Sequence, residues 1–147
     1  MKRFFAGCYN ITSIKFSPLF DTSNVKNMES LFGFCENLID LDISMFNTSN
    51  VVVMNFMFEG LYKIKRLDLS NFDTRKVEEA QLFFNHLYNL EYLDMSSWDT
   101  SNIKAGGWFF GDDGEMSESV TLKISNKFLK RKIQIPSTWE VINIDKL

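Results

Sequence analysis

The chain has 147 residues, with 16 basic and 19 acidic side chains, a formal charge of −3, one His and two Cys. This length suits a single domain with a sizeable core. Because 45% of the residues are hydrophobic and 24% are charged, the composition excludes a disordered chain. The apolar runs fall short of the roughly 18–20 residues that a membrane-spanning helix needs, so no membrane span is expected. The slight acidity argues against nucleic acid as a partner.

A repeat of 26 residues dominates the sequence. Segments beginning at residues 38, 64 and 90 match one another at this constant spacing, and a first copy, which begins at residue 11, has one extra residue. The match extends to two sets of apolar residues at equivalent positions of the units, which we call columns. They are Val25, Val51, Val77 and Ile103, and Phe32, Phe58, Phe84 and Phe110. We therefore expect a partial repeat over 1–10 and four units over about 11–37, 38–63, 64–89 and 90–110.

Each unit combines two periods. Leu67 and Leu69 alternate with polar residues, which predicts a strand, and residues 72–74 predict a turn whose side chains bond nearby backbone amides. Residues 51–58 are apolar at positions i, i+3, i+6 and i+7, which is typical of one face of a short helix. One such unit cannot bury its own apolar face, whereas stacked copies can. The sequence thus predicts an α/β fold, a right-handed solenoid of about four strand-turn-helix units.

Four columns of large apolar residues are expected to point into this solenoid. They are Leu41, Leu67 and Leu93; Ile43, Leu69 and Met95; Phe20, Phe46, Phe72 and Trp98; and Phe32, Phe58, Phe84 and Phe110. They account for much of the high phenylalanine content, 15 residues in all. The fourth unit carries Gly106 and Gly107 where its helix is expected, so this helix is predicted to be short or replaced by a loop.

The two ends of the solenoid differ. Residues 111–147 leave the repeat, and their alternating segments over 120–124 and 133–135 predict strands of a β-rich C-terminal cap. The partial repeat over 1–10 has no polar cap, which repeat proteins usually need for solubility. Self-association through this edge is therefore expected, or a neighbour that covers it.

The repeat resembles the BspA-like leucine-rich repeat family of bacterial surface proteins and mycoplasma-type lipoproteins. The resemblance rests on the LDLSNFDT motif over 67–74 and on the Val-x-x-Met-x-x-Met-Phe segment over 51–58, and it covers about residues 4–110. It implies a leucine-rich-repeat-like solenoid, a cell-surface or secreted location and a role in adhesion or protein recognition. It brings no catalytic residues, and the first residues do not read as a signal peptide.

Polar strand positions that point away from the core form two rows. One row contains Lys15, Asp42, Asp68 and Asp94, and its neighbour contains Ser13, Asp40, Arg66 and Tyr92. The functional interpretation is a recognition surface on the concave sheet face, formed by Asp40, Asp42, Arg66, Asp68, Tyr92 and Asp94. The alternative is that Asp recurs because the unit was duplicated and keeps a solvated face soluble.

No residue pattern indicates catalysis, a metal site or a cofactor. His86 has no second His and no assigned nucleophile, so it is expected to be a surface histidine. Cys8 and Cys35 fall at equivalent positions and are expected to be buried thiols rather than a disulfide. The acidic segment 112–115 lacks the spacing of a calcium loop, and the basic run 127–132 is expected to be a charged turn.

We therefore predict a non-enzymatic module that recognises a protein partner through the concave sheet face. The alternative is a structural spacer without a ligand of its own. The row of Asp40, Arg66 and Tyr92 varies while the inward columns stay apolar, and this difference favours recognition over a uniform spacer.

Overall fold

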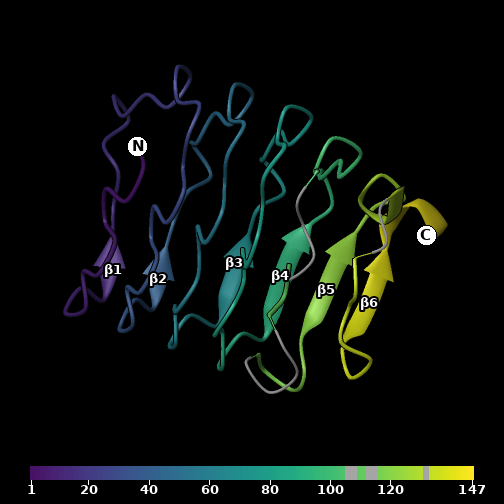
Figure 1. The fold of residues 1–147 in the computed structure, drawn as a ribbon. Coiled ribbons are helices and arrows are strands. Elements are labelled where there is room, and N and C mark those ends of the chain that lie inside the picture. Colours follow the sequence, from purple (N-terminus) through teal and green to yellow (C-terminus); the bar gives the residue numbers. More distant parts are fainter. Residues whose placement is uncertain (105–108, 112–115, 131–132) are drawn as a thin grey trace.

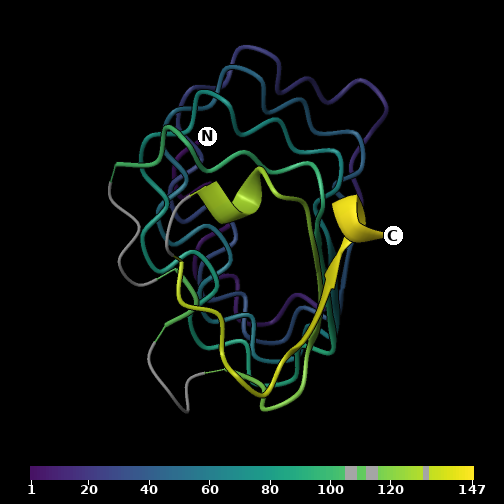
Figure 2. The same ribbon diagram turned by 90° about the vertical axis from the view of Figure 1, so that its right-hand side faces the viewer.

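Six short strands lie side by side in chain order along one wall of the molecule (Figure 1). The computed structural model describes residues 1–104, 109–111, 116–130 and 133–147. The strands are β1 (Ser13–Ile14), β2 (Asp40–Leu41), β3 (Arg66–Asp68), β4 (Tyr92–Met95), β5 (Thr121–Ile124) and β6 (Glu140–Asn143). Two 3₁₀ helices, η1 (Phe128–Lys130) and η2 (Ile144–Lys146), lie in the last part of the chain. In the view along the stack, successive repeats follow superposed paths (Figure 2).

All strand pairs are parallel. β1 pairs with β2, and β3, β4, β5 and β6 form a second sheet in that order. Leu67 of β3 lies opposite Leu93 of β4, which lies opposite Leu122 of β5. Where the sheet is interrupted between β2 and β3, the Asn71 amide donates to three carbonyls of the preceding repeat at 3.0–3.1 Å. Side-chain hydrogen bonds thus join the repeats at this boundary.

The predicted helices are not formed, so the strand-turn-helix solenoid was wrong. Within the described residues the only helices are η1 and η2, both of which lie beyond the repeats. The segments expected to be helical are runs of turns over 28–35, 54–61 and 80–87, with a further copy over 1–8. We call these four stretches the turn segments. A leucine-rich-repeat-like architecture with a helix in each unit is therefore excluded for the described repeats.

Hydrogen bonding explains why the turn segments are not helical. In an α-helix each N–H donates to the carbonyl four residues earlier. Here Met28, Ser30, Phe32 and Phe34 donate instead to Val53, Asn55, Met57 and Glu59 of the next repeat, at 2.7–3.1 Å. The N–H groups of Leu31 and Gly33 donate to carbonyls three residues earlier, as in turns, and that of Glu29 donates to Asn27 Oδ1. Left-handed backbone angles at Ser30 (φ 50°) and Phe34 (φ 59°) recur in the next two repeats and interrupt any helix.

The spacing of apolar residues in the turn segments fits either a helix or a series of turns, and for this reason the predicted helices were wrong. Met54, Met57, Phe58 and Leu61 are all fully buried. Their spacing of three or four residues suits one face of a helix, but a chain of successive turns gives the same spacing. An isolated helix of eight residues is marginal in water, whereas the turn segments gain hydrogen bonds to the adjacent repeat. The expected inward-facing residues were therefore right although the backbone conformation was wrong.

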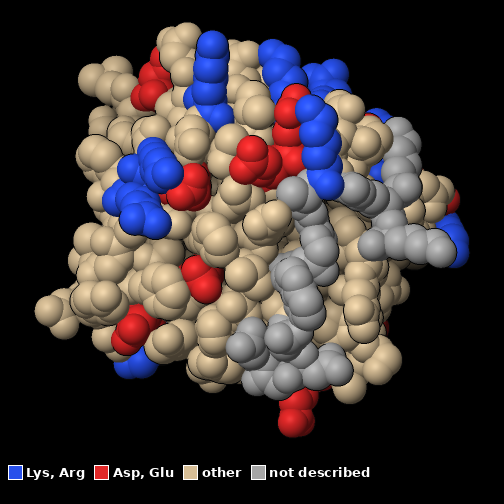
Figure 3. All heavy atoms as spheres, in the orientation of Figure 1, with Lys and Arg blue, Asp and Glu red and all other residues tan. Residues whose placement is uncertain are grey.

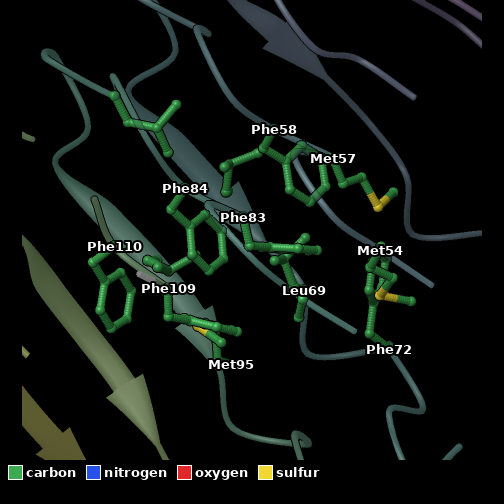
Figure 4. Close-up of a cluster of buried hydrophobic side chains, with 14 of the residues drawn as sticks. Met54, Met57, Phe58, Leu69, Phe72, Phe83, Phe84, Met95, Phe109 and Phe110 are labelled. Atoms are coloured by element: carbon green, nitrogen blue, oxygen red, sulfur yellow. The ribbon is translucent and has the colours of Figure 1, made fainter. Parts of the chain in front are cut away.

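A stack of phenylalanine rings runs through the core (Figure 4). The centroids of successive rings lie 5.6–6.1 Å apart, and their planes differ by at most 15°. The members are Phe5, Phe32, Phe58, Phe84 and Phe110, and Trp139 meets the last ring edge-on at 4.9 Å. The predicted inward columns are buried, except that Leu41 and Phe20 are half-buried. Phenylalanine therefore recurs because each ring packs on its own copy in the next repeat.

Residues 116–147 continue the sheet with β5 and β6, and η1 lies across the end of the stack (Figure 2). Phe128 of η1 is fully buried. The strand expected over 133–135 is not formed. The expected Gly106–Gly107 break and the acidic segment 112–115 lie outside the described residues, as do two residues of the basic run. Among the residues that the structure describes, none belongs to a helix with the length and apolarity that crossing a bilayer requires.

A column of buried threonines also joins the repeats. Thr22, Thr48, Thr74 and Thr100 are at most 2% exposed. The Thr74 hydroxyl donates to the Asp99 carbonyl at 3.0 Å and accepts from the Asp99 N–H at 2.8 Å. Thr22 and Thr48 make the same pair of bonds to the repeat that follows them. Each of these three hydroxyls thus satisfies two backbone groups that strand pairing leaves open, and the Thr100 hydroxyl donates to the Phe128 carbonyl.

Replacement of Thr74 by Val tests this column. The substitution keeps the side-chain shape but removes the hydroxyl that bonds both the Asp99 N–H and the Asp99 carbonyl. At about 1–3 kcal/mol for each of the two backbone groups, we expect the free energy of unfolding to fall by at least about 2 kcal/mol. Thr74→Ser keeps the hydroxyl and loses one methyl group, which costs about 1 kcal/mol. Urea unfolding measures both values. Equal stability of the two variants would contradict the structural role of the hydroxyl.

Candidate functional site

The exposed face of β3, β4 and β5 carries the best-connected group of polar side chains. We call Arg66, Asp68, Tyr92, Asp94 and Lys123 the strand-face cluster. The face of the molecule in Figure 3 carries acidic and basic side chains close to one another rather than a patch of one sign. A surface of this kind suits a partner with both charges better than it suits a polyanion.

Strand geometry and register position the cluster. In β3, Leu67 points into the core and is 1% exposed, so its neighbours Arg66 and Asp68 point outward. Parallel pairing sets Arg66 beside Tyr92 and Asp68 beside Asp94. Lys123 then lies beside Asp94 across the next strand pair. The apolar residues between these positions therefore fix the outward direction of all five side chains.

Direct contacts connect the cluster. The Arg66 guanidinium carbon lies 3.7 Å from the centre of the Tyr92 ring, which is a cation–π contact. Arg66 Nη2 also lies 3.7 Å from Asp68 Oδ2. The Tyr92 hydroxyl donates to Asp94 Oδ2 at 3.0 Å, and Lys123 Nζ lies 3.4 Å from the same oxygen. The tyrosine ring is thus held from one face by Arg66 and through its hydroxyl by Asp94.

The surroundings of Asp94 favour its charged form. The side chain is 6% exposed. Burial raises its pKa, but hydrogen bonds from Ser96 and Tyr92 and the nearby Lys123 outweigh this effect, so the pKa of Asp94 lies below its usual value. Burial, together with the bond to Asp94, raises the pKa of Tyr92. At neutral pH the pair is therefore a phenol donor and a carboxylate acceptor.

Asp40 and Asp42, the other two predicted site residues, belong to the neighbouring repeat and are not bonded to the cluster within the described residues. Asp40 belongs to β2, which pairs with β1 in the other sheet, and Asp42 follows β2. Both are exposed. In the described part of the chain, no hydrogen bond or ion pair joins either residue to the cluster. The structure thus brings together Arg66, Asp68, Tyr92 and Asp94 and leaves Asp40 and Asp42 outside.

The recurring aspartates have a local structural role. Asp42, Asp68 and Asp94 each accept a hydrogen bond from the N–H of the serine two residues later, at 3.0–3.1 Å. Such Asx turns end a strand and start the next bend. The hydrogen bonds of Ser44 lower the pKa of Asp42. The recurrence of Asp therefore has a sufficient cause in folding, and only Asp94 also contacts its neighbours across the sheet.

Lys123 was missed as a site residue. It lies outside the repeat, so the rows of equivalent positions do not include it. The available signal was the alternation of Val120, Leu122 and Ile124, which predicts a strand and thereby places Lys123 on the opposite face. The structure adds that this strand pairs with β4, which brings the lysine to Asp94.

The remaining polar candidates are His86 and the two cysteines. No group of three or more His, Cys, Asp or Glu residues within the described ranges is placed to hold a metal ion. His86 Nδ1 lies 3.9 Å from Glu59 Oε1 at the end of a turn segment. Cys8 and Cys35 are free, and the Cys35 thiol donates to the Phe5 carbonyl at 3.1 Å. Burial raises the pKa of Cys35 to about 11, so this thiol stays protonated at neutral pH.

Comparison with protein families matches residues 1–123 to the family described as "Mycoplasma protein of unknown function, DUF285". The chain belongs to this family. The match spans the repeats and extends through most of β5, so the DUF285 region includes the whole strand-face cluster. The comparisons with curated proteins and with solved structures found no match for this DUF285 chain.

Replacement of Asp94 by Asn tests the electrostatics of the cluster. Because the folded-state pKa of Asp94 is lowered, its charge stabilises the fold above the unfolded-state pKa of about 3.9, and this contribution is lost as the pH falls through the folded-state pKa. We expect Asp94→Asn to lower the melting temperature at pH 7 more than at pH 2. Asp42→Asn is the matched control: Asp42 makes the same turn but no ion pair within the described residues, so its loss should differ less between the two pH values. An equal loss for Asp94→Asn at both pH values would contradict the stabilising role of the charge.

Proposed function

We propose that the chain is a non-enzymatic protein-recognition module that binds its partner through the strand-face cluster. The observation that carries the proposal is the contact of Arg66 with the Tyr92 ring at 3.7 Å, with the Tyr92 hydroxyl bonded to Asp94. Tyr and Arg are the residue types most enriched at the energetic centres of protein interfaces. A tyrosine that is already held in place loses little further freedom when it binds.

The mixed charges of the cluster support a protein partner. Two basic and three polar or acidic side chains lie within one small area, and only Asp94 is deeply buried. Arg66 and Asp68 are more than half exposed and keep donors and acceptors available for a partner. We infer a partner surface with an exposed apolar or aromatic residue opposite Tyr92 and with charged groups around it.

The resemblance of the repeat to BspA-like proteins supports a cell-surface or secreted location. It rests on the LDLSNFDT motif over 67–74 together with the Met-Phe ending of the segment over 51–58. The proposed resemblance concerns these sequence motifs and not a helix in each repeat, because the described repeats contain none. Adhesion to a host or bacterial protein is the role that this location favours.

The alternative function is a structural spacer without a ligand. One observation favours it: Asp42, Asp68 and Asp94 make the same Asx turn, so their recurrence needs no ligand. The two functions differ in what they require of Arg66 and Tyr92, because a spacer has no use for an ordered tyrosine on its surface.

Replacement of Tyr92 by Ala separates the two functions. The immobilised protein is incubated with detergent extracts of host-cell and mycoplasma membranes, and captured proteins are quantified by mass spectrometry. If the cluster is the binding centre, Tyr92→Ala reduces capture of specific partners by tenfold or more, in line with hot-spot energies of about 2 kcal/mol. Arg66→Ala is expected to have a similar effect.

Tyr88→Ala is the matched control, because Tyr88 is also an accessible tyrosine (45% exposed) and lies outside the strands. It should leave capture unchanged, and the melting temperature of each variant shows whether the fold is intact. Partners captured equally by the Tyr92→Ala protein and the unsubstituted protein would reject the cluster as the binding centre. The absence of any specific partner would favour the spacer.

A further inference from the structure

One corner of the stack, just after the turn segments, exposes aromatic side chains beside a carboxylate. Equivalent positions of the repeats hold Tyr9, Glu36, Tyr62 and Tyr88. Tyr88 is 45% exposed, and Glu36 and Tyr62 are half-buried. Phe34, two residues before Glu36, is 38% exposed. We call Phe34, Glu36 and Tyr62, which belong to two adjacent repeats, the corner site.

Backbone and packing contacts hold the aromatic members of the corner site. The Phe34 N–H donates to the Glu59 carbonyl of the next repeat at 2.7 Å. The Phe34 ring lies against Gly60, where a Cβ atom would come within 2.7 Å of the ring carbon Cδ1, so glycine leaves the space that the ring occupies. The Tyr62 carbonyl accepts from Asn89 Nδ2 at 2.6 Å. Little ordering of these residues is therefore left to a ligand.

Tyr62 lies between a tyrosine and a glutamate along the stack. Its ring centroid lies 5.4 Å from that of Tyr88, which belongs to the following repeat. Glu36 occupies the same position in the preceding repeat. Burial raises the pKa of Tyr62, and the nearby Glu36 carboxylate raises it further. The side of Tyr62 that faces the preceding repeat thus combines an aromatic ring with a negative charge.

The strand-face cluster shows which group fits such a combination. There the Arg66 guanidinium carbon lies 3.7 Å from the centre of the Tyr92 ring, and Arg66 Nη2 lies 3.7 Å from Asp68 Oδ2. A tyrosine ring and a carboxylate thus hold one guanidinium between them. At the corner site, no lysine or arginine of the described residues makes an ion pair with Glu36 or a cation–π contact with Tyr62. The corner site therefore offers the same two groups to a cation from outside.

We propose that the corner site binds an arginine side chain of another protein. The guanidinium lies on the Tyr62 ring, with Phe34 beside it, and donates hydrogen bonds to the Glu36 carboxylate. Arginine fits better than lysine, because a planar guanidinium stacks on a ring while its N–H groups keep donating. Lys63 follows Tyr62 and is exposed, and its like charge favours an isolated arginine over a polybasic segment. This inference goes beyond the proposed function and does not rest on the strand-face cluster.

A short peptide with one arginine tests the proposal. The peptide consists of glycine and serine around a central arginine, with both ends blocked, and is titrated into the isotope-labelled full protein at low ionic strength. We expect saturable NMR shifts that are largest around Glu36 and Tyr62. The matched peptide carries citrulline in place of arginine, which keeps the shape of the side chain and removes its charge. It should cause no saturable shifts.

Two pairs of protein variants complete the test. Tyr62→Phe keeps the ring and should bind the peptide normally, whereas Tyr62→Leu removes the aromatic face and should weaken binding about fivefold. Glu36→Gln keeps the side-chain shape and should also weaken binding about fivefold. Its control is Glu118→Gln, the same change at an exposed glutamate outside the repeats, which should leave binding unchanged. The melting temperature of each variant shows whether the fold is intact.

Four results would overturn the proposal. The first two are no saturable shift at peptide concentrations up to about 10 mM and equal shifts with the citrulline peptide. The third is equal binding by the Tyr62→Leu and Tyr62→Phe proteins, or by the Glu36→Gln and Glu118→Gln proteins. The fourth is a set of shifts centred on Tyr92 instead of Tyr62, which would place the arginine on the strand-face cluster and leave the proposed function untouched.

Discussion

Hydrogen bonding between backbone segments 25 or 26 residues apart is the interaction on which the structure depends. The strands pair in this way on one wall, and the turn segments donate every second N–H to the next repeat. This hydrogen bonding fixes the length of each repeat, because the chain must return to the equivalent position beside the previous repeat. Identical positions then lie next to one another, so a residue packs on its own copy.

This constraint explains which residues recur. Phenylalanine stacks on phenylalanine in the core, and each buried threonine bonds the backbone of the repeat after it. A shift of one residue in register would separate both sets of contacts at once. The same constraint brings aspartates to equivalent positions on the strands, and at Asp94 the cost of burying the charge is offset by Ser96, Tyr92 and Lys123.

Much of the packing was predictable from the sequence, and the backbone of the turn segments was not. The repeat length identified the inward columns, because duplication at constant spacing places equivalent residues in equivalent environments. It did not distinguish a helix from a series of turns, because both bury residues such as Met54, Met57 and Phe58. The decisive difference is whether the N–H groups bond within the segment or to the next repeat, and this depends on contacts distant in sequence.

The candidate site was likewise predictable from the sequence only in part. Alternation along the strands predicted that Arg66, Asp68, Tyr92 and Asp94 point outward, and register brought them together. Asp40 and Asp42 were placed in the same rows, but strand pairing stops between β2 and β3, and no hydrogen bond or ion pair among the described residues joins them to the cluster. The role of the threonines was underestimated, because a threonine next to a turn is ordinarily a local cap, and its bonds to the next repeat depend on stacking.

Scalar couplings across hydrogen bonds test the central claim most directly. A long-range HNCO spectrum of the labelled protein detects which carbonyl accepts from each N–H group. The account predicts couplings from the Ser30 and Phe32 nitrogens to the Asn55 and Met57 carbonyls. Couplings from Phe32 to the carbonyl four residues earlier, Met28, would instead show a helix in this segment and would contradict the account.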